Sequence, residues 1–252
     1  MSSVVARFGV VNGRALTAHA IDLLVFGPHP DDIEIGLGGT IAKHVALGLR
    51  VGLCDLTRGE MGTNGTPEER LSEAEAAREA LGASWRENLN WPDRRIGKEP
   101  VHLDQAVAFI RRHRPRVVAV PYWRDRHPDH VAASEFLTEA AFNAGLRRYP
   151  GEGAAWKPEW VCYYFVNDAA APSFVVDVSA HYEAKRKALD CHSSQFTGAG
   201  SGAVATRLNT PIFRQLVESR DAQFGALAGV RWAEGIVVRE PILRTSLMKS
   251  PA

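Results

Sequence analysis

The chain alternates short apolar segments with longer segments whose apolar residues recur at helical spacing. Three apolar runs are continuous or nearly so, which is the pattern of strands buried on both faces of a parallel sheet. They are residues 21–26 (IDLLVF), 51–56 (VGLCDL) and 117–120 (VVAV). Between the first two, four apolar residues at four-residue spacing across residues 37–49 predict an amphipathic helix. Thr66 opens a Thr-Pro-Glu-Glu capping box, which predicts a helix over residues 67–81.

The alternation continues along the rest of the chain. Further helices are expected at 103–112, 131–144, 179–191 and 211–224, and further strands at 161–166, 174–178 and 235–239. No internal repeat or linker divides the sequence, so we expect one domain over residues 1–252, with residues 1–20 as an N-terminal extension. Alternating strands and helices predict a doubly wound α/β fold, which binds ligands beyond the carboxyl ends of its strands at a topological switch point.

Composition and charge exclude several classes of protein. The 30 Lys and Arg residues balance 29 Asp and Glu residues, which argues against binding nucleic acid through phosphate neutralisation. Three cysteines without a CxxC pair exclude a disulfide framework and a thiolate zinc site, and they fit a reducing compartment. The sequence contains no apolar run long enough to span a membrane and no clear secretion signal at its start. We therefore expect a cytoplasmic protein.

A His-Pro-Asp-Asp segment follows the first strand directly, where an α/β enzyme places its site. His29 and Asp32 are three residues apart in a loop that turns toward a helix, and an imidazole with a carboxylate suits zinc. Asp31 lies between them. Alternatively, the aspartate caps the next helix and the histidine is a polar surface residue.

A second segment of the same kind follows the strand at residues 117–120. It is YWRDRHPDH, residues 122–130, and it contains another His-Pro-Asp unit. If His29, Asp32 and His130 bind one metal ion, they form a three-ligand site with an open position, which distinguishes catalytic from structural zinc. The alternative is that the histidines of this second segment are surface residues of a solvated loop.

An open zinc site is suited to the hydrolysis of an amide or an ester. In such a site Asp31 would accept the proton of the attacking water, and His127 would act as the acid or the oxyanion stabiliser. Asp129 would hold His127 in its cationic form and fix its orientation.

Two weaker signals suggest substrate contacts. Arg58 follows the second strand and would bind an oxyanion or a hydroxyl, unless it pairs with Glu60 or the acidic loop. Gln195 closes the segment HSSQ after a predicted helix and would lie at the rim of the pocket, although such residues are also ordinary helix caps. The glycine-rich segment 197–205 is expected to be a loop.

The two motifs, His29-Pro-Asp-Asp and His127-Pro-Asp-His, resemble those of the PIG-L/LmbE-like zinc-dependent N-acetylglucosaminyl deacetylases. The likeness extends over nearly the whole chain from Ile21 and includes residues 56–70, 172–189 and 191–196. These flanking segments look most like the branch that deacetylates N-acetylglucosaminyl-malate in bacillithiol biosynthesis. The glycine-rich segment and residues 232–236 (WAEGI) depart from the aromatic loop expected to close over the sugar.

The resemblance implies a Rossmann-like three-layer α/β/α fold with a mostly parallel sheet, and a homo-oligomer, a hexamer or a trimer. It also implies one Zn²⁺ per chain, held by His29, Asp32 and His130, with Asp31 as general base and His127 as acid or oxyanion stabiliser. Arg58 is expected to contact the substrate. Fe²⁺ shares these ligand types.

Three alternatives stay open at this stage. The first is a deacetylase of another amino-sugar conjugate, mycothiol-like or a chitooligosaccharide. The second is an amidase acting on a mycothiol-like conjugate. The third is a Rossmann-like protein that binds a sugar or nucleotide without turnover, which the absence of GxGxxG after the first strand disfavours.

Overall fold

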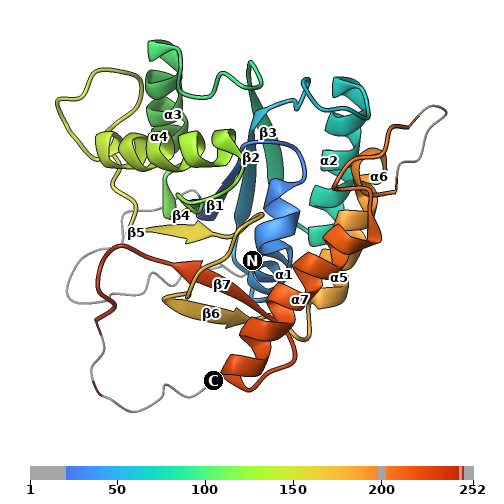
Figure 1. Ribbon diagram of the computed structural model, residues 1–252. Coiled ribbons are helices and arrows are strands. Elements are labelled where there is room, and N and C mark those ends of the chain that lie inside the picture. Colours follow the sequence, from blue (N-terminus) through green and yellow to red (C-terminus); the bar gives the residue numbers. More distant parts are fainter. Residues whose placement is uncertain (1–20, 198–202, 244–245, 247–252) are drawn as a thin grey trace, which may run out of the picture.

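The computed structural model describes residues 21–197, 203–243 and 246. The N-terminal extension and most of the glycine-rich segment therefore lie outside the described residues. Within them, seven strands form one sheet with helices on both faces (Figure 1). The strands are β1 (Ile21–Gly27), β2 (Val51–Thr57), β3 (Trp85–Trp91), β4 (Pro115–Pro121), β5 (Trp160–Tyr164), β6 (Phe174–Asp177) and β7 (Ala233–Val237). The helices are α1 (Asp32–Ala46), α2 (Pro67–Leu81), α3 (Pro100–His113), α4 (Pro128–Ala144), α5 (Tyr182–Cys191), α6 (Ser193–Phe196) and α7 (Pro211–Ala228).

The strand order is β3-β2-β1-β4-β5-β7-β6, and the first five strands along the chain run parallel. Strand β7 is antiparallel to both of its neighbours, β5 and β6. The expected three-layer fold with a mostly parallel sheet is confirmed. The chain moves outward from β1 through β2 to β3, then returns to add β4 and β5 on the other side. The loops that follow β1 and β4 therefore diverge, and this is the switch point at which such sheets bind ligands.

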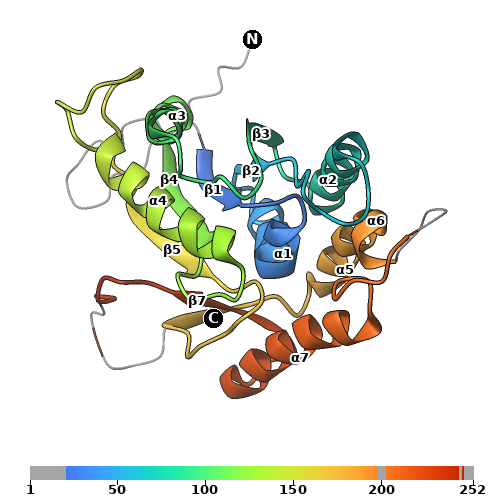
Figure 2. The same ribbon diagram turned by 45° about the horizontal axis from the view of Figure 1, so that its top comes forward.

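Side chains of β1 alternate between two apolar cores, one on each face of the sheet. Leu24 and Phe26 join the core that contains residues of α3 and α4, whereas Leu23 and Val25 join the core that contains residues of α1, α2 and α5. Figure 2 shows the two groups of helices on opposite sides of the strands. Burial on both faces explains why the sequence of this strand is nearly continuously apolar.

The capping box before α2 forms as expected. The Thr66 hydroxyl accepts a hydrogen bond from the Glu69 backbone N–H at 3.1 Å, and the Glu69 carboxylate accepts one from the Thr66 backbone N–H at 2.7 Å. At the other end, Gly82 closes the helix with a φ of 72°, a left-handed conformation that glycine adopts without strain.

Several elements differ from the sequence-based expectation. Strand β3 (WRENLNW) was not predicted, because as the edge strand of the sheet it carries polar residues and is mostly only half-buried. Helix α4 begins at Pro128, three residues earlier than expected, with His127 as its N-cap. This earlier start places Asp129 and His130 in the first helical turn. The final strand runs over Ala233–Val237 and so precedes the expected range by two residues.

None of the helices in the described part of the chain combines the length and the apolar character needed to cross a membrane.

Candidate active site

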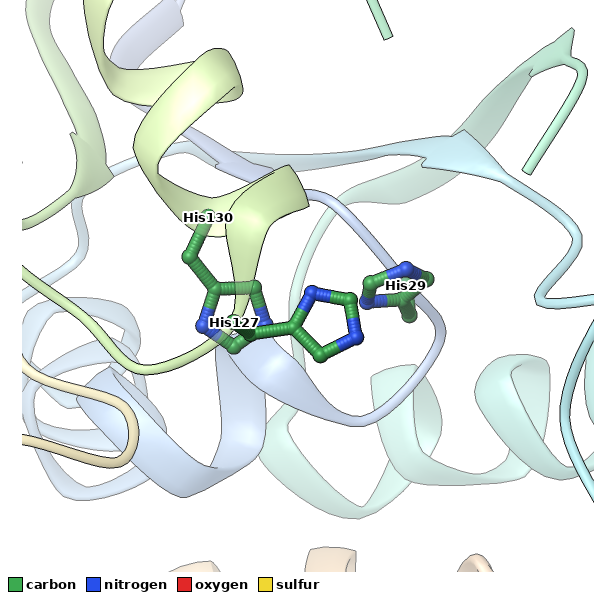
Figure 3. A group of neighbouring side chains, drawn as sticks. All are labelled: His29, His127 and His130. Carbon is green, nitrogen blue, oxygen red and sulfur yellow. The ribbon is translucent and has the colours of Figure 1, made fainter. Parts of the chain in front are cut away.

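The two His-Pro-Asp segments meet at the carboxyl ends of β1 and β4. His29 lies in the loop after β1, and Asp32 is the first residue of α1. His127 caps α4, and His130 lies in its first turn. Figure 3 shows the rings of His29, His127 and His130 converging from these two places. The ring centroid of His127 lies 4.8 Å from that of His29 and 4.7 Å from that of His130.

The Asp32 carboxylate lies between two imidazoles. Its Oδ2 atom is 3.1 Å from His29 Nδ1, and its Oδ1 atom is 3.2 Å from His130 Nε2. Adjacent ligand atoms of a tetrahedral zinc ion, with bonds of about 2.0–2.1 Å, are separated by about 3.3 Å. These two separations are close to that value, and the donor types of the three residues suit zinc.

Other side chains near this cluster also offer ligand atoms. One nitrogen from each of His29, His127 and His130 lies within 4.8 Å of the others, and so do single atoms of His29, Asp93 and Asp129. Asp93 is not among the site residues predicted from the sequence, because it follows the edge strand β3, whose polar pattern does not predict a strand. The sequence marks it only as an aspartate two residues after Trp91.

The buried charges of the cluster shift one another's pKa values. Burial by itself would lower the pKa of His130, but the nearby Asp32 and Asp125 carboxylates outweigh it and raise that pKa to about 9. In the same way, burial opposes but does not prevent an upward shift of the His29 pKa, which is driven by Asp129, Asp32 and Asp93. The two histidines in turn hold the pKa of Asp32 well below its usual range despite burial.

Asp31 has a strained backbone and a buried carboxylate. Its φ is 129°, in the region that favours glycine. Burial raises the pKa of its carboxyl group to about 6, although the Arg70 guanidinium opposes this shift. Arg70 Nη2 lies 3.3 Å from Asp31 Oδ2 and donates to the Pro30 carbonyl at 2.8 Å, while its Nη1 donates to the Gly59 carbonyl at 2.9 Å. Arg70 therefore links the loops that follow β1 and β2.

His127 and Asp129 contact each other through the backbone. The Asp129 N–H donates to His127 Nδ1 at 3.2 Å, whereas the Asp129 carboxylate accepts from Arg94 Nη1 at 2.8 Å and lies 3.4 Å from His29 Nε2. Burial, followed by the neighbouring His29 and His130, lowers the pKa of His127. A neutral His127 whose Nδ1 accepts a hydrogen bond carries its proton on Nε2. Because this pKa is lowered, the structure does not favour the cationic His127 expected from the sequence. The role of Asp129 in orienting His127 stays a prediction.

The two residues predicted to bind substrate lie at different depths. The Arg58 side chain is 41% exposed, lies 3.8 Å from Glu68, and is not among the residues that line the cavity. Gln195 is buried in the cavity wall, where its Nε2 donates to the Asn64 carbonyl at 2.7 Å. Their contacts with substrate stay predictions.

The cluster forms the floor of a cavity of about 450 Å³, a volume typical of small-molecule sites. Four arginines line this cavity together with apolar residues such as Phe213. They are Arg70, Arg94, Arg126 and Arg207. Guanidinium groups around a polar floor favour a hydrophilic ligand with many hydrogen-bond acceptors.

Comparison with known proteins identifies relatives over most of the chain. The family model PIG-L, described as GlcNAc-PI de-N-acetylase, matches residues 24–141. Diacetylchitobiose deacetylase of Thermococcus kodakarensis is 32% identical, and the match covers 85% of this chain and 81% of the relative. The 1D-myo-inositol 2-acetamido-2-deoxy-alpha-D-glucopyranoside deacetylase of Rhodococcus opacus is 30% identical, with 84% of this chain and 94% of the relative covered.

The fold is also found in a solved structure. The conserved protein TT1542 of Thermus thermophilus superposes with a TM-score of 0.83 at 40% identity, and the match covers 91% of this chain and 100% of that one.

Proposed function

Because the chain belongs to the PIG-L family of de-N-acetylases, we propose that it is a metal-dependent hydrolase that removes the acetyl group from an N-acetylglucosamine conjugate. The observation that carries this proposal is the convergence of His29, Asp32 and His130 at the floor of one cavity. Zinc is the proposed metal, one ion per chain. A bound zinc ion lowers the pKa of a water molecule to about 7 and polarises an amide carbonyl.

The proposed general base is Asp31, which accepts a proton from the attacking water. Arg70 restrains its carboxylate and fixes the adjacent Pro30 carbonyl, so the base is held in place before substrate arrives. His127 Nε2–H is the proposed donor to the oxygen of the tetrahedral intermediate, because the Asp129 backbone N–H occupies Nδ1. The leaving amine then needs a proton, which the protonated Asp31 returns.

The names of the relatives favour particular substrates. One relative is named for diacetylchitobiose and another for a glucosaminide of inositol. These names support a sugar or inositol aglycone better than the malate aglycone expected from the sequence. We therefore propose the former substrates first, and N-acetylglucosaminyl-malate as a further member of the test panel.

The decisive experiment supplies the zinc-loaded protein with diacetylchitobiose, N-acetylglucosaminyl-inositol and N-acetylglucosaminyl-malate, and measures released acetate and free amine. We expect stoichiometric acetate and amine from at least one of them. Asp31→Asn should lower kcat by about 10²–10⁴, the usual contribution of a general base. Absence of acetate from all three conjugates would refute the proposed reaction, and unchanged turnover by the variant would exclude Asp31 as the base.

The ligand set and the assembly have separate tests. His130→Ala should abolish stoichiometric zinc binding, and full zinc occupancy in this variant would refute the ligand assignment.

A homo-oligomer, proposed from the family resemblance, is tested by light scattering coupled to size-exclusion chromatography. A mass equal to that of one chain would refute it.

A further inference from the structure

Asp125 is a buried carboxylate beside the metal-ligand cluster for which the proposed chemistry has no role. It lies in the loop between β4 and α4, two residues before the N-cap His127. Its side chain is only 3% exposed, and its Oδ1 atom lies 3.0 Å from Nδ1 of His130. The other ring nitrogen of His130, Nε2, faces Asp32 at 3.2 Å. The two nitrogens of this histidine therefore have different partners on opposite sides.

The protein holds Asp125 with several N–H groups. Its Oδ1 accepts from the His127 backbone at 2.8 Å and from Asn167 Nδ2 at 3.0 Å. Its Oδ2 accepts from the backbone N–H of Asn167 at 2.9 Å and lies 3.4 Å from that of Asp168. These contacts join the loop after β4 to the segment that follows β5. They hold the carboxylate in an orientation that faces His130.

We propose that Asp125 is a positioning residue that keeps the proton of His130 on Nδ1 and so presents Nε2 to the metal ion. The inference rests on the proposed function, in which His130 is a ligand. A metal-bound histidine commonly donates its second ring N–H to a carboxylate, which fixes both the tautomer and the orientation of the ring. The geometry around His130 has this form, with Asp125 as the acceptor.

Asn167 is the competing partner for the same nitrogen. Its Nδ2 lies 3.5 Å from His130 Nδ1, farther than the Asp125 oxygen. If Asn167 donated to Nδ1, the proton would move to Nε2, which then could not bind metal. Asn167 Nδ2 instead has Asp125 Oδ1 at 3.0 Å, and Asn167 Oδ1 accepts from Arg207 Nη1 at 2.9 Å. The amide of Asn167 is therefore already engaged at both ends.

Only an acceptor suits the position of Asp125. Both of its oxygens face N–H donors, so an asparagine amide would direct its NH₂ group at other donors in either orientation. Asp125→Asn changes no heavy-atom position in the side chain and tests this requirement directly. Asp168→Asn is the matched control, because Asp168 lies next to Asn167 in the segment that follows β5, is exposed, and contacts Asp125 through its backbone N–H.

The experiment titrates metal-stripped protein with Zn²⁺ in competition with a chelating dye. We expect Asp125→Asn to weaken zinc binding by about 10–100-fold, the usual effect of losing such a partner. Asp168→Asn should bind zinc as the unmodified protein does. An unchanged dissociation constant in Asp125→Asn, with zinc binding lost in His130→Ala, would overturn this inference and leave the proposed function intact. Retained zinc binding in His130→Ala would refute the ligand assignment itself.

A second measurement does not depend on the folding of a variant. In the zinc-loaded, ¹⁵N-labelled protein, the His130 ring should carry its proton on Nδ1 and show the chemical shift of a metal-bound nitrogen at Nε2. A proton on Nε2, or metal bound through Nδ1, would overturn the inference.

A third measurement compares the turnover of Asp125→Asn with that of the unmodified protein at two zinc concentrations. The loss of turnover in the variant should be smaller at saturating zinc than at limiting zinc, because the carboxylate acts through the metal ligand His130.

Discussion

At the scale of one residue, Asp31 combines a carboxylate beside the proposed metal ligands with a strained backbone. Its carboxylate is buried beside the proposed ligands, and its backbone has a φ that ordinary residues avoid. Arg70 fastens the same loop through the Pro30 carbonyl. The tertiary contacts of Arg70 therefore help to hold the strained backbone.

This strain predicts the order of stability of two variants. Asp31→Ala keeps a Cβ atom on the strained backbone, whereas Asp31→Gly removes it. We expect the glycine variant to be the more stable of the two, because a residue in such a conformation costs about 1–3 kcal/mol. Elsewhere glycine is the less stable choice by about 0.5–1 kcal/mol. Urea unfolding of both variants measures the difference, and a more stable alanine variant would contradict the strain.

His102 provides a prediction of pH dependence away from the site. Its ring stacks on Trp91 with a centroid distance of 4.4 Å, and burial lowers its pKa. Between the folded pKa and about 6.5, the unfolded chain then binds more protons than the folded one. The free energy of unfolding should therefore decrease as the pH falls from about 6.5 through the folded pKa.

The test compares the unmodified protein with His102→Gln by denaturant unfolding between neutral and mildly acidic pH. Other groups titrate in both proteins, so the difference between the two slopes reports His102 alone. We expect the slope to be shallower in the variant. Equal slopes would show that the pKa of His102 is not lowered on folding.

At the scale of elements, Arg86 connects three secondary structures through buried charges. It projects from β3 and pairs with Glu34 of α1 and with Asp55 of β2, and none of the three side chains is more than 4% exposed. Asp55 Oδ1 and Oδ2 accept from its Nη2 and Nε at 2.8 and 2.7 Å. This network ties the edge strand β3, which Asp93 follows by two residues, to its neighbours.

Removing one partner of a buried ion pair leaves an uncompensated charge. Arg86→Gln should therefore lower the free energy of unfolding by about 3–5 kcal/mol. The matched control is Arg112→Gln, which breaks the exposed pair with Glu87 and should cost at most about 1 kcal/mol. Chemical denaturation of both variants measures these effects. Equal losses of unfolding free energy in the two variants would show that burial of the Arg86 ion pairs does not add to their contribution.

The sequence predicted those elements whose own residues carry a local signal of structure. The continuous apolar run of β1 and the capping box of α2 are local signals, and both elements formed as expected. Strand β3 was not predicted because Arg86 finds its buried partners on other elements and the edge position leaves the remaining polar residues only half-buried, and neither feature is local. The start of α4 was misplaced because His127 is an uncommon N-cap.

At the scale of the whole molecule, the proposed metal ion would join the loops after β1 and β4. Binding to the folded protein alone stabilises it by about 2.7 kcal/mol when free metal is 100 times the dissociation constant. Removal of zinc with a chelator should therefore lower Tm, and restoring zinc should reverse the change. His130→Ala should show no such response, whereas a chelator effect of full size in that variant would contradict the proposed ligands.

The sequence by itself determined the fold class, the order of most elements and the two His-Pro-Asp segments that supply the proposed ligands. These are local patterns, and parallel strands bring their carboxyl ends to one edge of a sheet whatever the rest of the chain does. Only the tertiary structure decided that Asp93, Arg70 and Asp125 lie against this cluster. Each contact joins residues whose side-chain directions depend on packing between elements, and no spacing along the chain encodes such a direction.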